Sequence, residues 1–453
     1  MPYTTAEQCI NLFLVSASTL DAQREQLEPF QQQWLEHNAF DASPGQFINL
    51  PNAQGHIDAV LVGYDPNQVL TALGAVSPAL AAGDYRLAAV PDGMDEKLLL
   101  LGWSLGQYRF ERYKSQADNG ARLHLPEALR DQVQSLQQAH FMVRDLINTP
   151  PLDLSPSDLA QACRDCGELF GAQVNVVDGE ALENDYPAIH AVGMGSDRGP
   201  CLIELTWGKD EHPLICLAGK GVIFDTGGLN LKGGDRMLHM KKDMGGSAHA
   251  LALARLIMEQ QLPVRFKMYI AAVENMVSGR SYRPSDVINT RRGYTVEITN
   301  TDAEGRVVLC DALQRACESK PELIIDFATL TGAARIALGP DVPPFFTNRD
   351  ELSQALMQAG NDSADPVWPL PLVDGYERYL HSHVADMTNC APSSFAGAIN
   401  AALFLRRFVD EDIPWIHLDI YGWNNGSRAA RPRGGEAQGL RAVFQFLQQR
   451  YSA

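Results

Sequence analysis

Short apolar runs alternate with helical patterns along the chain beyond residue 150. The apolar runs lie at 213–219, 264–272, 322–329 and 415–420, and the helical patterns at 245–260, 305–319 and 396–409. Runs of this kind are typical of strands buried in a largely parallel sheet. Their alternation with helices predicts an α/β architecture, with helices on both faces of a mostly parallel central sheet.

A smaller unit precedes this region. Residues 58–65 and 85–91 are predicted strands and 95–113 a predicted helix, followed by the polar, glycine-containing stretch 114–122. A second helix is expected from Pro126 to Leu146, because the two prolines of the following INTPP bar its continuation. These patterns predict a small N-terminal α/β domain over 1–122, a linker helix over 123–147 and a larger C-terminal domain over 148–453.

Bulk properties exclude some classes of partner. The formal net charge of −18 argues against a nucleic-acid backbone or an anionic membrane as the main partner. No run of 18 apolar residues predicts a membrane span, and the N-terminus lacks the basic segment of a secretory signal. The eight cysteines show no disulfide-like spacing, which favours a reduced cytoplasmic setting. Cys163 and Cys166 form a CxxC within a predicted helix; we interpret them as two thiols on a helix, with a redox or metal pair as the alternative.

Acidic residues in glycine-rich segments carry the chemistry of the C-terminal region. Three cations accompany them, and the segments adjoin the predicted strands and helices so that they can converge at the carboxyl ends of the strands. Four clustered carboxylates carry a charge of about −4, which a folded site does not tolerate without compensation, and two divalent cations would cancel it. The acids are Asp225, Asp243, Asp302 and Glu304, and the cations are Lys220, Lys232 and Arg306.

The segment NTDAEGR (300–306) has a local interpretation of its own. If ITNTDAE (298–304) is extended, Asp302 and Glu304 face the same side, and Gly305 lets the backbone turn into a helix. Arg306 then lies in the first helical turn, a setting that binds anions. The alternative is a helix cap with a surface arginine.

The other charged positions also allow two interpretations. Asp225 ends an apolar strand and precedes a sharp Thr-Gly-Gly turn, whereas Asp243 precedes Met-Gly-Gly and is either a ligand or a helix N-cap. Lys220 is either a solvated amine or, beside a dication, a deprotonated nitrogen ligand. Lys232 is expected to remain a cation directed at developing negative charge.

These segments, in this order and spacing, resemble the leucyl aminopeptidase (cytosol aminopeptidase) family of two-metal exopeptidases. The matching segments are GKGVIFDTGG (219–228), Lys232, KDMGG (242–246) and NTDAEGR, and the resemblance extends from about residue 141 onward. It implies that Lys220, Asp225, Asp243, Asp302 and Glu304 bind two divalent metals, Zn²⁺ or Mn²⁺. It implies catalytic roles for Lys232 and for Arg306, the latter through a bound bicarbonate. It also implies a homohexamer that removes the N-terminal residue from peptides with a free N-terminus.

The resemblance implies a substrate pocket as well. Met240, Thr329 and Gly332 would line the pocket for the departing side chain, with Asn300 and Ala333 on the leaving side. Two stretches depart from the family pattern. The sequence GGDRMLHMKKD after Lys232 places His239 where relatives carry another residue, and 424–441 is unusually basic and glycine-rich. The preferred terminal residue is therefore left open.

Two alternatives to a general aminopeptidase remain. One is a dipeptidase of the Cys-Gly type, and the other is a catalytically weak DNA-binding or structural oligomer. The charge of −18 and the intact set of seven charged residues weigh against the second. The sequence contains no G-x-x-x-x-G-K-[ST], H-E-x-x-H or G-x-S-x-G motif, so ATPase, single-zinc protease and serine hydrolase functions lack their signatures.

Overall fold

The computed structural model describes residues 2–452. The chain forms two compact units. The first comprises the chain up to Phe141 together with Asn424–Gly434, and the second comprises Met142–Trp423 and the chain from Gly435 onward. The division falls inside a long helix, α5 (Arg130–Asn148), whereas the sequence pattern sets boundaries after residues 122 and 147. The boundaries 1–122, 123–147 and 148–453 stay a prediction about folding units.

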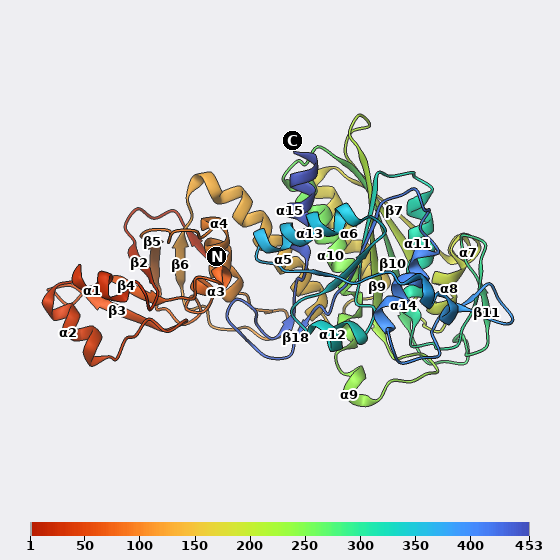
Figure 1. Cartoon of the computed structure of the whole chain (residues 1–453), viewed down its shortest axis with the longest axis horizontal. Helices are drawn as coiled ribbons and strands as arrows, with labels where there is room; N and C mark the ends of the chain where they lie inside the picture. Colours follow the sequence, from red (N-terminus) through yellow and green to blue (C-terminus); the bar gives the residue numbers. More distant parts are fainter. Residues whose placement is uncertain (1, 453) are drawn as a thin grey trace. The chain divides into compact units, whose positions relative to one another are not determined.

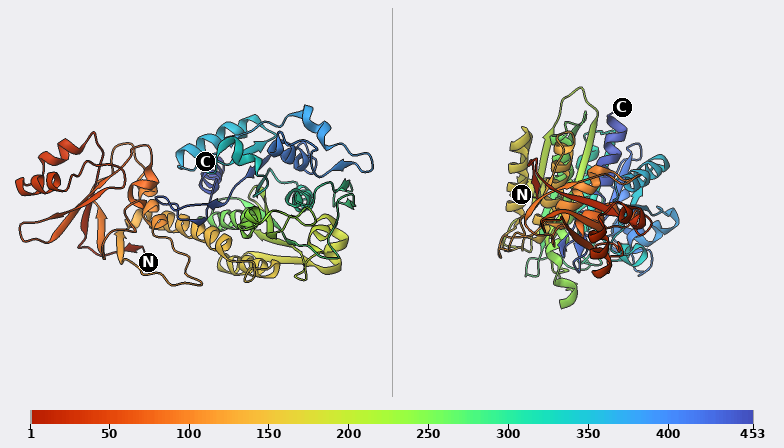
Figure 2. Two further views of the ribbon diagram at one scale, coloured as in Figure 1. Left: turned by 90° about the horizontal axis from the view of Figure 1, so that it is seen from below. Right: turned by 90° about the vertical axis from the view of Figure 1, so that its left-hand side faces the viewer.

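The N-terminal part of the first unit, coloured red to orange in Figures 1 and 2, combines a β-sheet with helices. Its six strands are ordered β1-β6-β5-β2-β4-β3, and all neighbours are parallel except β3 and β4. The strands are β1 (Tyr3–Thr4), β2 (Ile10–Val15), β3 (Phe47–Pro51), β4 (Ile57–Gly63), β5 (Gly83–Leu87) and β6 (Ala121–His124). The helices are α1 (Leu20–Glu25), α2 (Pro29–His37), α3 (Val69–Gly74), α4 (Glu96–Gly106) and the 3-10 turn η1 (Glu127–Leu129).

One expectation for this unit is wrong. The helix predicted over 95–113 ends at Gly106. The helix packs tightly at this end, since a Cβ on Gly106 would lie 2.3 Å from the carbonyl oxygen of Gly74 in α3. The Gln107 side chain then donates to the Ala121 carbonyl oxygen at 2.9 Å, which diverts the chain toward β6.

The second unit is built on an eight-stranded sheet with the order β15-β14-β17-β13-β9-β10-β8-β7. The four central strands β17, β13, β9 and β10 are mutually parallel, as the apolar runs predict. β8, β7 and β14 add antiparallel neighbours at the two sides. The strands are β7 (Gln173–Asp178), β8 (Cys201–Trp207), β9 (Leu214–Asp225), β10 (Arg265–Asn275), β13 (Leu323–Ala328), β14 (Pro344–Thr347), β15 (Trp368–Pro369) and β17 (Trp415–Asp419).

Shorter elements and helices surround this sheet. A three-stranded sheet joins β11 (Val287–Asn289), β12 (Thr295–Glu297) and β16 (Met387–Thr388), and β18 (Trp423–Asn424) pairs with β19 (Gly434–Gly435). The remaining helices are α6 (Pro156–Phe170), α7 (Gly179–Asp185), α8 (Pro187–Gly193), α9 (Gly234–Met237), η2 (Met240–Met244), α10 (Gly245–Glu259), α11 (Glu304–Cys317), α12 (Ala333–Leu338), α13 (Asp350–Asp362), η3 (Asp374–Leu380), α14 (Gly397–Arg406) and α15 (Leu440–Tyr451). Across residues 2–452, no helix has the length and apolarity needed to cross a bilayer.

Helices α10 and α11 lie on opposite faces of the central strands (Figure 1). Gly219 of β9 faces α10, because a Cβ on this glycine would lie 2.7 Å from the Ser247 Cα. The next residue, Lys220, faces Gly305 of α11. Successive side chains of a strand point to opposite faces. The strand β9 therefore directs Gly219 toward α10 and Lys220 toward α11.

The CxxC lies on α6, whose N-terminus is closed by a capping box between Ser155 and Asp158. Both thiols are buried and free, and burial raises the pKa of Cys166 to about 11. A thiol with so high a pKa is a poor nucleophile. The structure thus supports the interpretation of two packed thiols on one helix.

Candidate metal centre

Asp225 is the last residue of β9 and begins the site. The next turn depends on glycine, since Gly227 and Gly228 have φ of +86° and +59°. The Gly227 N–H donates to Asp225 Oδ1 at 2.8 Å, so this turn holds the carboxylate in place. The sharp Thr-Gly-Gly turn predicted from the sequence is present.

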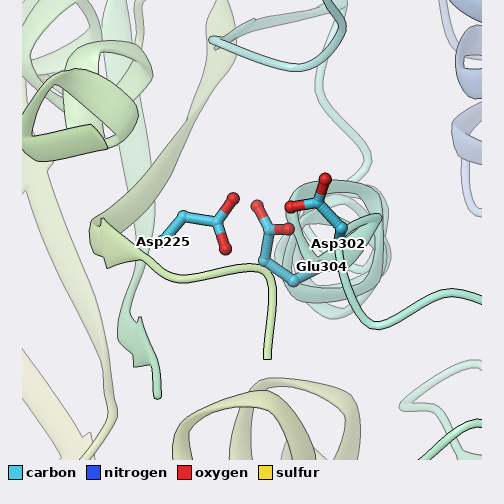
Figure 3. A group of neighbouring side chains, drawn as sticks. All are labelled: Asp225, Asp302 and Glu304. Carbon is cyan, nitrogen blue, oxygen red and sulfur yellow. The ribbon is translucent and has the colours of Figure 1, made fainter. Parts of the chain in front are cut away.

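Asp302 and Glu304 face Asp225 from the start of α11. Glu304 is the first residue of this helix, and Asp302 lies in the turn before it. One carboxylate oxygen from each of the three acids lies within 4.8 Å of the others. Figure 3 shows the three carboxylates directed toward one another.

The extended conformation considered for ITNTDAE (298–304) is wrong, although Arg306 does lie in the first turn of the following helix. The chain is not extended here, since β12 ends at Glu297 and Asp302 N–H donates to Asn300 Oδ1 in a turn. Gly305 does not make the turn, because it lies inside the first helical turn. Its missing Cβ instead leaves space for Lys220.

Lys220 is buried, with 2% of its surface exposed, so the solvated alternative is wrong. Its Nζ lies 2.7 Å from Asp243 Oδ2 and 2.9 Å from Glu304 Oε1, and donates to the Thr329 carbonyl oxygen at 3.0 Å. This amine therefore joins an acid of η2 to an acid of α11.

Asp243 does not cap α10, which has no side-chain cap hydrogen bond. Its Oδ1 instead accepts from the Thr329 hydroxyl at 2.8 Å. Asp243 is thus held by β9 and by the loop after β13, and it faces the same cluster as the other acids.

Lys232 completes the cluster from the loop after β9. Its Nζ lies 2.7 Å from Asp225 Oδ2 and also contacts Asp302 Oδ1. Because the Lys232 N–H donates to the Thr226 carbonyl oxygen, the loop folds back over the strand end and brings the ammonium to the acids.

The cluster has more negative than positive charge. Burial, followed by repulsion from Asp243, raises the pKa of Asp225 to about 6. Burial, followed by repulsion from Asp225, raises the pKa of Glu304 to about 7. Burial alone would lower the pKa of Lys220, but the charges of Asp243 and Glu304 outweigh it and raise that pKa. Four acids against two ammonium groups leave a formal excess of about −2 in a buried space.

The donor set fits divalent cations. Glu304 Oε2 is buried without a hydrogen-bond donor, so it has a lone pair available for a cation. Carboxylate oxygens together with one amine nitrogen form a donor set that suits Zn²⁺ or Mn²⁺. Added positive charge would also relieve the repulsion that raises the pKa values of Asp225 and Glu304.

Residues that the sequence analysis did not single out support the acids from behind. Asn275 Nδ2 donates to Asp225 Oδ1 at 2.8 Å and to the Thr301 carbonyl oxygen at 2.9 Å. The Tyr282 hydroxyl donates to the same carbonyl at 2.8 Å. Asn275 could have been found, because it is a polar residue at the end of an apolar run; it ends β10 in register with Asp225. Thr301 and Tyr282 carry no such signal.

Arg306 lies in the first turn of α11, as predicted, and is 7% exposed. Its Nη1 donates to the Asn389 carbonyl oxygen at 3.0 Å. Asn389 also binds the turn before α11 through its side chain, which accepts from the Thr299 N–H and donates to the Asn300 carbonyl oxygen. The sequence gives no sign of Asn389, which comes from a loop some 85 residues away.

The predicted substrate residues occupy the loops around the cluster. Thr329 contacts Asp243 directly, and Gly332 and Ala333 begin α12. Met240 is half-buried at the start of η2, and Asn300 is held by Asn389. Their assignment to a substrate pocket stays a prediction.

His239 stacks on Trp423, with ring centroids 4.9 Å apart, and is not among the residues that converge on the acids. The basic stretch after β17 divides between the two units. Ala430 packs against Gly74 in the first unit. In the second unit, Gln438 Oε1 accepts from the N–H groups of Tyr421 and Gly422.

Known proteins match this chain over most of its length. Residues 141–444 match the catalytic domain of the cytosol aminopeptidase family, and residues 10–126 match the M17 aminopeptidase N-terminal domain. A probable cytosol aminopeptidase of Syntrophotalea carbinolica is 39% identical over 384 residues, covering 80% of this chain and 76% of the relative.

Solved structures of related proteins have the same fold. The cytosol aminopeptidase of Coxiella burnetii has a TM-score of 0.96 and 46% identity, and the match covers 99% of both chains. The bottromycin maturation enzyme BotP, in complex with Mn, has a TM-score of 0.89 and 31% identity over 98% of this chain and 100% of that chain.

The chain therefore belongs to the cytosol aminopeptidase family of exopeptidase hydrolases. It is a metal-dependent aminopeptidase that acts on peptides. The family resemblance and the α/β fold inferred from the sequence are confirmed.

Proposed function

We propose that this enzyme holds two divalent cations and releases N-terminal residues from peptides. Lys220, Asp225, Asp243, Asp302 and Glu304 are the proposed ligands. The observation that carries the proposal is the buried cluster itself, in which three acids bring oxygens within 4.8 Å and Lys220 joins the fourth to them. Lys220 would act as a nitrogen ligand after losing the proton that it now donates to Asp243 Oδ2.

The cations and the catalytic residues have separate tasks. When bound, two divalent cations would activate a water and polarise the scissile carbonyl, with a bicarbonate ion as the base. The Lys232 ammonium would stabilise negative charge as it develops on the carbonyl oxygen. The Arg306 guanidinium, buried at the N-terminus of α11, would hold a planar anion of the size of bicarbonate.

Substrate orientation follows from the same arrangement. The free α-amine of the peptide would approach the acids, which explains removal of one residue from the end rather than internal cleavage. Met240, Thr329 and Gly332 would contact the departing side chain, and Asn300 and Ala333 the remaining peptide. Contact between Thr329 and Asp243 supports a pocket that adjoins the cluster.

The family comparisons support further properties. A relative that binds Mn, BotP, supports Mn²⁺ as one of the two candidate metals, with Zn²⁺ as the other. We also propose a homohexamer and a cytoplasmic location, the latter supported by relatives named cytosol aminopeptidases. Nucleic acid and membrane are not expected partners.

A comparison of blocked and unblocked peptides tests this proposal. With Mn²⁺ or Zn²⁺ added, Leu-Gly-Gly should release leucine, while its N-acetylated form should not react. Equal hydrolysis of the two peptides would refute anchoring through the α-amine. Inactivity with every divalent metal tested would instead favour a binding or structural role.

A further inference from the structure

Two cations of the second unit pack on one aromatic ring. The Arg335 guanidinium carbon, from α12, lies 4.2 Å from the centroid of the Tyr421 ring. The Lys242 Nζ, from η2, lies 5.1 Å from the same centroid. Three segments far apart in the sequence therefore place two positive charges around Tyr421.

Neither cation has a carboxylate within ion-pair distance among the described residues, although the charge of the adjacent Asp243 acts on Lys242. Within residues 2–452, the side chains of Lys242 and Arg335 make no hydrogen bond or ion pair, although Lys242 is only 4% exposed. Lys220 and Lys232, by contrast, each contact two carboxylates. A buried ammonium needs compensation, and an aromatic face offsets only part of its desolvation. Arg335 adds a second positive charge beside the buried Lys242 ammonium. An external anion would therefore be stabilised here.

This pair lies beside the acidic cluster. Lys242 directly precedes Asp243, and a Cβ on Gly332 would lie 3.6 Å from Arg335 Nη2. A Cβ on Gly422, next to Tyr421, would lie 3.5 Å from the Thr329 methyl group. The two cations thus adjoin Thr329 and Gly332, which are the residues proposed to contact the departing side chain.

We propose that Arg335, Lys242 and Tyr421 form a specificity subsite that favours peptides whose N-terminal residue is Asp or Glu. The inference rests on the proposed function of the acidic cluster. The side-chain carboxylate would lie between the two cations, with its aliphatic part against the Tyr421 ring. Arg335 can bind a carboxylate through two parallel N–H groups, while Lys242 supplies a point charge. The side-chain carboxylate of the substrate would thus supply a counter-charge for Lys242 and Arg335.

The test compares glutamyl and glutaminyl amides of aminomethylcoumarin, which differ in charge but hardly in shape. The measured quantity is the ratio of kcat/KM for Glu to kcat/KM for Gln, with metal content determined for each protein. Arg335→Gln should lower this ratio by about tenfold, and Arg335→Lys should restore much of it. Lys242→Met should also lower the ratio.

Arg349→Gln is the matched control, because Arg349 is also half-buried and, among the described residues, its guanidinium donates only to the carbonyl oxygens of Asn348 and Glu411. The ratio of kcat/KM for Glu to kcat/KM for Gln in Arg349→Gln should equal that of the wild type. An unchanged ratio in Arg335→Gln, or an equal fall in Arg349→Gln, would overturn the subsite.

Dipeptides test whether the two cations bind the C-terminal carboxylate of the peptide instead. If Arg335→Gln slows Leu-Gly but not Leu-Gly amide, while the Glu/Gln ratio is unchanged, the pair binds the peptide C-terminus and our assignment to the N-terminal side chain is wrong. Failure of the proposed function is distinct, since the wild-type enzyme would then hydrolyse neither leucyl nor glutamyl amides with any metal.

Discussion

Lys220 occupies the space beside Gly305 in which any other residue would place its Cβ. A Cβ built on Gly305 would lie 2.5 Å from Lys220 Cε and 2.7 Å from Lys220 Nζ. A real Cβ does not approach a non-bonded atom this closely, so the glycine permits the lysine to reach Asp243 and Glu304. A residue that binds nothing itself thereby sets the position of a proposed ligand.

Substitution of this glycine should therefore disable the site. In Gly305→Ala, the added methyl group would displace the Lys220 amine, and we expect kcat/KM to fall by about 100-fold with lower metal occupancy. Metal content by mass spectrometry and hydrolysis of Leu-aminomethylcoumarin measure both effects. Gly279→Ala is the control, because its Cβ would meet no atom within 4 Å. Equal activity of the two variants would contradict the steric argument.

Much of the fold follows from the sequence because buried strands carry a strong local pattern. The runs at 213–219, 264–272, 322–329 and 415–420 became the four central parallel strands, and Asp225 lies at a strand end as expected. The helix predicted over 95–113 is too long, because its end depends on contacts with Gly74 and Ala121, which are distant in the sequence.

The candidate site was predictable in composition but not in geometry. Acids and lysines in glycine-rich segments identified the cluster, since their charge requires compensation wherever they meet. The backbone at 300–305 was misjudged, because its conformation depends on Asn389, which binds the Thr299 N–H and the Asn300 carbonyl. The function of Gly305 likewise depends on a partner, Lys220, that only the folded chain brings near.

Asn275 should tune the affinity of the site for metal. Its amide donates to Asp225 Oδ1 and so orients this carboxylate. Asn275→Ala removes that donor, and we expect the metal affinity to fall by 10- to 100-fold, on the order found for residues that support metal ligands. Titration with Mn²⁺ by calorimetry measures the change.

Asn400→Ala is the control for Asn275, since Asn400 is equally buried but donates to the Phe395 carbonyl. If both variants bind Mn²⁺ with the affinity of the wild type, Asn275 does not support the site.

Lys232 should act in catalysis rather than in metal binding. Lys232→Ala removes the ammonium that contacts Asp225 and Asp302. It leaves all five proposed metal ligands in place. We expect full metal content and a loss of most turnover, about 100-fold or more in kcat, on the scale of a lost oxyanion donor. Metal analysis and steady-state kinetics separate the two readouts. Loss of metal together with turnover would move Lys232 into the ligand set.

His249 should make the stability of the second unit depend on pH. Its Nε2 accepts from the Gln438 N–H at 2.9 Å, and burial lowers its pKa to about 4. The folded-state pKa is lower than the unfolded value near 6.5, so the stabilisation is present above pH 6.5 and is lost as the pH falls toward 4. Linkage gives a loss of about 1 kcal/mol in the free energy of unfolding between pH 7.5 and 5.5.

His249→Gln retains an acceptor oxygen without a titrating group, and so provides the comparison. Urea unfolding at the two pH values should show a smaller loss in this variant, by that same ~1 kcal/mol. Identical pH dependence in both proteins would show that His249 is not buried in its neutral form.

The central claim is that Asp225, Asp243, Asp302 and Glu304, together with Lys220, hold two divalent cations. Anomalous scattering from crystals of the full chain grown with Zn²⁺ or Mn²⁺ tests it most directly. We predict two anomalous peaks per subunit, both in contact with these side chains. A cluster without a peak in either metal, or peaks only at other acidic groups of the surface, would contradict the account.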